Sequence, residues 1–327
     1  MSTAEEADSS PLADVHAAFA RLRRQLDSII LGQAQMKERV LVCLLAGGHA
    51  LIEGPPGTAK TLLALSLARL LSCRFRRIQF TPDLMPVDLL GTNVYDQKTQ
   101  EFVFQAGPVF TDVLLADEVN RTTPRTQSAL LEAMQERAAT IDGVRRPISP
   151  VFFVVATQNP VEYEGTYPLP EAQKDRFLLK IEVGHPSPED ELAVLRAYGE
   201  GRTLHEDGLA ALQPVLDAAA LQSAIQIVAR VRVEEKILSY LREVVAATRS
   251  EEGVQLGAGA RGSLALLAAA RAQAALRGRD FVTPDDVKEL APAVLAHRVT
   301  LAPEAEMEGL DLAAVLQRIF DRLEVPR

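Results

Sequence analysis

The sequence predicts an α/β fold in which a mainly parallel sheet is covered by helices, followed by an all-helical domain. Between residues 48 and 183, short apolar runs typical of buried strands alternate with stretches of helical periodicity. Beyond residue 186 the chain becomes rich in alanine and shows helical patterns only. A chain of 327 residues has room for two or three domains.

The N-terminal residues 1–28 are predicted to form a polar tail, disordered over residues 1–10, and a helix. A short apolar segment ends at Gly32 and Gln33, and a second helix is expected over residues 34–46. Between the later strands, helices are expected at residues 62–71 and 127–134. The apolar runs that predict strands are residues 50–52, 78–80, 113–116, 151–156 and 178–183.

Two stretches interrupt this alternation and are predicted to be hairpins. Residues 91–108 place apolar side chains on both sides of a polar turn, and residues 138–150 contain the turn dipeptide Asp142-Gly143. From their residues alone, these hairpins fit surface decoration and substrate-contacting loops equally well.

The second domain, residues 186–327, is predicted from helix-start signals and amphipathic stretches. Pro188 and the acidic residues after it favour a helix start. Residues 233–248 and 263–276 are amphipathic, and a further helix is expected to begin at Thr283 and Pro284.

The stretch from Gly54 to Thr61 closely matches the phosphate-binding pattern G-x-x-x-x-G-K-[ST], and it lies between a predicted strand and a predicted helix. Such a loop directs backbone N–H groups at one point beside a helix N-terminus, which suits a polyphosphate. Ala59 replaces the second glycine and is expected to need no positive φ. A plain glycine-proline turn before a helix is the alternative. The residues of the loop are Gly54, Pro55, Pro56, Gly57, Thr58, Ala59, Lys60 and Thr61, with Leu62 following.

These residues suggest ATP with Mg²⁺ as the ligand. Lys60 is expected to reach the β- and γ-phosphates, and the Thr61 hydroxyl to ligate Mg²⁺. Asp117 and Glu118 end a predicted strand, so Asp117 is a second candidate Mg²⁺ ligand and Glu118 a candidate general base. A surface Asp-Glu turn is the alternative.

Three further polar residues are candidates for the same site. Asn159 ends another predicted strand and either orients water or simply belongs to a turn with Pro160. Arg176 is the candidate for an arginine supplied to a neighbouring subunit, and Arg261 for one that reaches the γ-phosphate of its own chain. Exposed arginines in weak ion pairs are the alternative for both.

The composition excludes several other classes of protein. The formal net charge of −9 disfavours broad nucleic-acid binding, and the arginine clusters at residues 21–24 and 69–77 are expected to be solvated. Two cysteines form no disulfide framework or metal pattern, and no apolar run is long enough to span a membrane. With an acidic N-terminus unlike a signal peptide, the chain is expected to be soluble and cytoplasmic.

Six motifs, in this order, resemble the MoxR family of AAA+ ATPases over the chain from about residue 12 onward. They are residues 54–61 (GPPGTAKT), 114–121 (LLADEVNR), 126–136 (TQSALLEAMQE), 156–160 (ATQNP), 169–177 (LPEAQKDRF) and 282–287 (VTPDDV). Alanine at position 59 is usual in this family.

The resemblance implies an AAA+ P-loop αβα sandwich with a helical lid, and roles for particular residues. Lys60 and Thr61 resemble the Walker A pair and Asp117 and Glu118 the Walker B pair. Asn159, Arg176 and Arg261 resemble sensor 1, the arginine finger and sensor 2. The adenine-pocket segment corresponds to Ile30, Leu31 and Gly32, the helix-2 insert to residues 83–109, and the pre-sensor-1 hairpin to residues 138–150, within a nucleotide-binding domain over residues 29–185.

The resemblance also implies a homo-oligomeric ring, typically a hexamer, that acts on protein clients with a partner carrying a von Willebrand factor A domain. Both hairpins would then face the central pore. Residues 257–261 lack the Ser-Pro common before the sensor 2 arginine, so the helix start at Arg261 is less constrained. A magnesium-chelatase-like or DNA-remodelling motor and a rarely hydrolysing nucleotide-gated scaffold are the alternatives; the negative charge disfavours the DNA motor, and the acidic pair with both arginines disfavours the scaffold.

Overall fold

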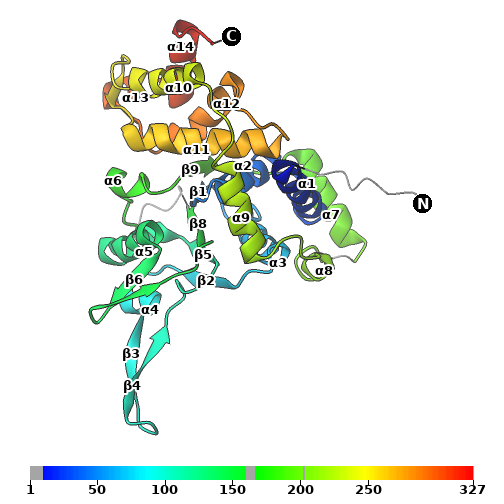
Figure 1. Ribbon diagram of the computed structural model, residues 1–327, viewed down its shortest axis with the longest axis vertical. Helices are drawn as coiled ribbons and strands as arrows, with labels where there is room; N and C mark the ends of the chain where they lie inside the picture. The colour runs from blue at the N-terminus through cyan, green and yellow to red at the C-terminus, as the bar shows by residue number, and fades with distance from the viewer. Residues whose placement is uncertain (1–9, 160–165, 202, 327) are drawn as a thin grey trace, which may run out of the picture.

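A computed structural model of the chain describes residues 10–159, 166–201 and 203–326 (Figure 1). Most of the predicted polar tail lies outside these residues. The first helices are α1 (Pro11–Ile29) and α2 (Ala34–Leu45). Ser10 caps α1 by accepting a hydrogen bond from the Ala13 N–H, and Pro11 occupies the first helical position.

Five parallel strands form the central sheet in the order β2-β5-β8-β1-β9, which confirms the predicted α/β class. Two strands are offset from their predictions: β2 begins at Phe75, three residues before the expected residue 78, and β8 begins at Phe153, two residues after the expected residue 151. Because β2 is an edge strand bonded only to β5, its exposed positions carry arginines rather than apolar side chains. The strands are β1 (Ala50–Glu53), β2 (Phe75–Gln79), β5 (Val113–Asp117), β8 (Phe153–Gln158) and β9 (Leu179–Glu182).

Alternate residues of these strands enter two separate cores, as the pleat of a strand requires. Ile52, Leu115 and Val155 pack into the core that includes α1, α2 and α3 (Lys60–Leu70). Leu51 and Leu114 face the other core, which includes α5 (Pro124–Glu136). The short 3-10 helix Val119–Arg121 links β5 to α5, and α6 (Glu171–Lys174) precedes β9.

Both predicted hairpins are present. The first joins β3 (Gly91–Asp96) to β4 (Glu101–Ala106) after α4 (Pro86–Leu90), and the second joins β6 (Ala138–Ile141) to β7 (Val144–Pro147). Figure 1 shows the β3–β4 hairpin projecting at the end of the molecule opposite α14. Phe102 on this hairpin is 72% exposed and Tyr95 is 50% exposed, so its apolar side chains face solvent.

The C-terminal part is mainly helical over the described residues and includes a short antiparallel pair, β10 (Val254–Leu256) and β11 (Thr300–Leu301). The expected start at Pro188 is confirmed, with Ser187 accepting from the Asp190 N–H, and so is the start at Thr283. The helices are α7 (Pro188–Gly199), α8 (Glu206–Ala211), α9 (Ala218–Val228), α10 (Glu235–Ala247), α11 (Ala260–Leu276), α12 (Pro284–Leu295), α13 (Pro303–Met307) and α14 (Leu312–Arg322).

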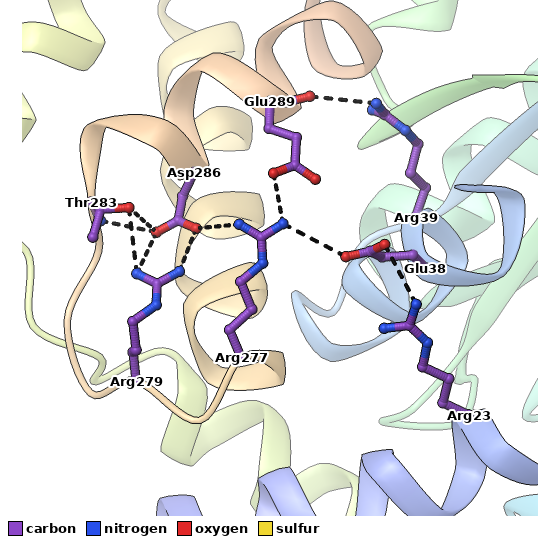
Figure 2. Close-up of polar contacts among 8 residues, drawn as sticks. All are labelled: Arg23, Glu38, Arg39, Arg277, Arg279, Thr283, Asp286 and Glu289. Carbon is purple, nitrogen blue, oxygen red and sulfur yellow. Dashed lines mark hydrogen bonds and ion pairs between the residues drawn. The ribbon is translucent and has the colours of Figure 1, made fainter. Parts of the chain in front are cut away.

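A network of ion pairs joins the loop between α11 and α12 to the N-terminal helices (Figure 2). Asp286 is fully buried and pairs with Arg277 at 3.4 Å and Arg279 at 2.7 Å. Arg277 also pairs with Glu289 at 2.6 Å and Glu38 at 3.9 Å. These contacts, with the apolar packing of α1 on α11, hold the N-terminal helices against the C-terminal part. The division at residues 28 and 185 stays a prediction.

None of the described helices combines the length and apolar character needed to cross a bilayer.

Candidate nucleotide-binding site

A cavity of about 520 Å³ lies at the carboxyl ends of β1, β5 and β8. Most of the residues predicted for nucleotide binding line it. They are Ile30, Leu31, Gly54, Pro56, Gly57, Thr58, Ala59, Lys60, Thr61, Leu62, Asp117, Glu118 and Asn159. Gly32, Pro55, Arg176 and Arg261 do not line it.

The loop between β1 and α3 has the shape that its glycines allow. At Gly54 a Cβ would meet the backbone carbonyl oxygen of Val183. Only glycine therefore lets these two backbone segments lie so close together. Ala59 has a φ of 61°, in the left-handed region, which corrects the expectation that this position avoids positive φ. The cost of that conformation is about 1–2 kcal/mol for an alanine, which the surrounding loop must offset.

The N-terminus of α3 lines the cavity, and no side chain of the described residues caps it. Ala59 is the N-cap and has no side-chain oxygen to bond the first N–H groups of this 11-residue helix. Free N–H groups at the positive end of a helix dipole suit a phosphate. Lys60 Nζ donates to the carbonyl oxygens of Gly54 at 2.6 Å and Pro55 at 3.0 Å. Burial lowers the pKa of Lys60, while the charges of Asp117 and Glu118 oppose that shift.

The acidic pair is held by its neighbours in two different directions. Asp117 accepts a hydrogen bond from the Thr157 hydroxyl at 2.5 Å and pairs with Arg77 at 2.8 Å. Glu118 adopts a left-handed conformation with a φ of 56°, and its carboxylate pairs with Arg121 at 3.1 Å. A continuing strand would place the two carboxylates on opposite faces, whereas with the turn at Glu118 both residues line the same cavity.

Thr157 and Arg77 were not among the predicted site residues, although both line the cavity. The Thr157 hydroxyl donates to the Asp117 carboxylate and accepts from the Glu118 backbone N–H at 2.9 Å, so one hydroxyl contacts both residues of the pair. The register of the sheet is the signal from which both residues could have been found. Ala116 pairs with Ala156 and Gln79 with Asp117, which places Thr157 and Arg77 beside Asp117 once the strand order is known.

Apolar side chains form the wall of the cavity away from the phosphate loop. Ile29, Ile30 and Leu31 contribute one side. Val194 and Tyr198 of α7 contribute another side, which the sequence analysis did not anticipate because helical periodicity does not show what a helix faces. A polar phosphate cradle beside an apolar slot matches the two ends of a nucleotide.

Arg176 and Arg261 lie together in a different place. Both line a surface hollow that also includes Arg137 and Arg298, and Arg261 pairs with Asp175 at 3.6 Å. Within the described residues, Arg176 forms no ion pair and its buried Nε has no hydrogen-bond partner. The structure thus brings Arg261 to Arg176 rather than to the phosphate loop of the same chain.

Comparisons with known proteins match both parts of the chain. The model of the ATPase family associated with various cellular activities matches residues 49–179, and the AAA lid domain matches residues 246–319. The protein named chaperone MoxR1 of Mycobacterium tuberculosis is 44% identical over 96% of this chain and 84% of its own length. The chain belongs to the MoxR family of AAA+ ATPases.

Two further comparisons cover nearly the whole chain. The protein YeaC of Bacillus subtilis is 45% identical over 96% of both chains. A crystal structure of a "putative ATPase" from Cytophaga hutchinsonii superimposes with a TM-score of 0.88 at 37% identity, covering 97% of each chain. Residues 246–319 therefore form an AAA lid, nucleotide binding follows from the family, and ATPase activity is supported at family level.

Proposed function

We propose that this MoxR protein is a Mg²⁺-dependent ATPase that works as a homo-oligomeric ring and remodels or matures protein clients. The observation that carries the proposal is the separation of the charged groups. The phosphate loop and both acids line one cavity, whereas Arg176 and Arg261 lie in another hollow. Such an arrangement is completed when a second subunit brings its arginines to the first subunit's nucleotide.

The residues around the loop fit a nucleotide with its metal. The uncapped N-terminus of α3 and Lys60 would bind the phosphates, and Ile30 and Leu31 would contact the base. Thr61 and Asp117 offer oxygen ligands of the kind that Mg²⁺ prefers. Bound Mg²⁺ supplies positive charge that offsets the charge of the phosphates.

Hydrolysis then needs a base and a water position. Glu118 would accept a proton from the attacking water, whose oxygen bonds to the γ-phosphorus as the β–γ P–O bond breaks and ADP leaves. Asn159, at the end of β8, would orient that water. Arg176 of a neighbouring subunit would stabilise the charge that develops on the γ-phosphoryl group.

We assign contact with the protein client to the two hairpins. The β3–β4 hairpin exposes Tyr95 and Phe102, and an exposed apolar tip suits contact with unfolded or partly folded polypeptide. The name of MoxR1 as a chaperone supports a protein client. A hexamer and a partner with a von Willebrand factor A domain complete the proposal.

The deciding experiment measures ATP binding and turnover of Glu118→Gln. This variant keeps the size of the side chain and loses the base, so we expect ATP affinity within about threefold of wild type and turnover reduced by about 10²-fold or more. Turnover of Glu118→Gln at the wild-type rate would contradict the role of Glu118 as the general base. Turnover stimulated strongly by DNA would favour a DNA-remodelling motor instead.

Mixed rings test the donated arginine. Arg176→Ala is expected to bind ATP normally, to lose turnover by ~10³-fold or more, and to inhibit wild-type subunits when the two are mixed before assembly. Glu132→Ala is the matched control, because Glu132 lines a second surface hollow together with Arg176. Turnover of Arg176→Ala at the wild-type rate would contradict a shared site.

A further inference from the structure

Arg298 of the lid is almost completely buried, and all five of its N–H donors form hydrogen bonds. Its side chain is 4% exposed. Nε donates to the Asp175 carboxylate at 2.7 Å, and one Nη donates to the Leu178 carbonyl at 3.0 Å and to the Val294 carbonyl. The other Nη donates to the carbonyls of Asp175 at 3.1 Å and Phe177 at 2.6 Å. A guanidinium has five donors, so none is left unsatisfied.

Four of these five bonds go to the segment that carries Arg176. The carbonyls of Asp175 and Phe177 stand immediately before and after Arg176 in the chain. His297, next to Arg298, donates from Nε2 to the same Phe177 carbonyl at 2.9 Å. The Asp175 carboxylate accepts from Arg298 and also pairs with Arg261. The lid therefore donates hydrogen bonds to the backbone on both sides of Arg176.

We propose that Arg298 is a positioning residue for Arg176, holding the lid and the arginine finger as one rigid unit that is presented to the neighbouring subunit's nucleotide. This inference rests on the proposed function. A guanidinium that binds several carbonyls at fixed angles defines the backbone path far better than a single ion pair does. Movement of the lid would then move Arg176 with it.

Variants of Arg298 should lower turnover without lowering nucleotide affinity. A 1 Å displacement of a catalytic group costs about 10²-fold in rate, so we expect Arg298→Gln to reduce kcat by about that factor while the ATP Kd stays within about threefold. Arg298→Lys should also be impaired, because one ammonium cannot replace the planar fork. Arg277→Gln is the matched control, since Arg277 is a lid arginine paired with carboxylates that do not contact residues 175–178.

Mixing two impaired variants separates positioning from a general structural defect. Arg298→Gln subunits keep Lys60, Asp117 and Glu118, whereas Glu118→Gln subunits keep a well-placed Arg176. In a random 1:1 mixture about a quarter of the interfaces join the intact halves. We expect the mixture to regain turnover well above the sum of the two variants.

The pair Arg176→Ala with Glu118→Gln distinguishes the possible failures. If this pair regains turnover and the Arg298→Gln pair does not, the inference about Arg298 is overturned and the shared site stands. If neither pair regains turnover, the shared site itself fails. Melting curves check that the variants are folded at the assay temperature. If both Arg298 variants melt below that temperature, Asp175→Asn replaces them, because it weakens the contact between Arg298 and Asp175 while keeping both side chains. Its mixture with Glu118→Gln must then regain turnover in the same way.

Discussion

At the scale of single residues, the site depends on neighbours that set the direction of each charged group. Asp117 and Glu118 are adjacent in sequence, yet Asp117 is paired with Arg77 and Glu118 with Arg121. Thr157, which is 1% exposed, connects them through one hydroxyl. Residues that orient the side chains binding a metal or substrate are usually nearly as important to a site as those side chains themselves.

Thr157→Val should therefore damage catalysis while leaving the fold intact. Valine keeps the shape but removes the donor to Asp117 and the acceptor for the Glu118 N–H, so we expect turnover to fall by ~10–100-fold and to need more Mg²⁺. Turnover measured across a Mg²⁺ titration checks this. Thr157→Ser, which keeps the hydroxyl, should stay near wild type; equal loss in both variants would point to packing instead.

At the scale of elements, the loop between β1 and α3 combines two backbone constraints of opposite kinds. Gly54 is required because the Val183 carbonyl approaches its Cα, and this follows from how β1 and β9 lie side by side. Ala59 instead accepts a left-handed conformation that glycine would take more easily. The loop is thus held by its surroundings as well as by its sequence.

Gly54→Ala should destabilise the protein and disrupt phosphate binding together. The added methyl group has no room, so we expect the free energy of unfolding to fall by about 1–3 kcal/mol and ATP affinity to drop at least tenfold. Denaturant unfolding and nucleotide titration measure the two effects. Gly184→Ala is the control, because a Cβ there meets nothing within 4 Å. Similar losses in both variants would contradict the steric explanation.

At the scale of the whole molecule, two buried histidines join parts that are far apart in the chain. His49 accepts from the Val154 N–H at Nδ1 and donates from Nε2 to the Met134 carbonyl, so it is neutral in the fold. Burial lowers the pKa of His49 to about 4 and that of His297 well below its usual value. His297 connects the lid to Phe177.

Acid should weaken the fold through these two residues. Between the unfolded histidine pKa of about 6.5 and the folded value, the unfolded chain binds protons that the folded chain does not, so stability is lost as the pH falls through this window. For His49 alone, a folded pKa of about 4 corresponds to a loss of about 3 kcal/mol by pH 4. Unfolding at pH 7, 6, 5 and 4 measures the slope. His49→Gln should flatten it, and His185→Gln, at an exposed position, should not; an unchanged slope in His49→Gln would be contrary to this account.

Much of the fold was predictable because its signals are local. Apolar runs, helical periodicity, the Asp142-Gly143 turn and the helix-start signals at Pro188 and Thr283 each act within a few residues. β2 was shifted because an edge strand needs no apolar alternation, and Ala59 was judged wrongly because the sign of φ depends on the chain around it. Arg77 and Thr157 were missed because only the strand order brings them to Asp117.

By itself, the sequence determined the alternation of strands and helices and the phosphate-binding loop, since short-range sterics and periodicity encode both, and its six motifs indicated the family by resemblance. Only the tertiary structure decided that Arg261 lies with Arg176, that Tyr198 lines the cavity, and that Arg298 donates hydrogen bonds to residues 175–178. The Arg298 contacts join segments that are 120 or more residues apart in the chain. Their partners are selected by how the sheet and the lid pack, which no local pattern records.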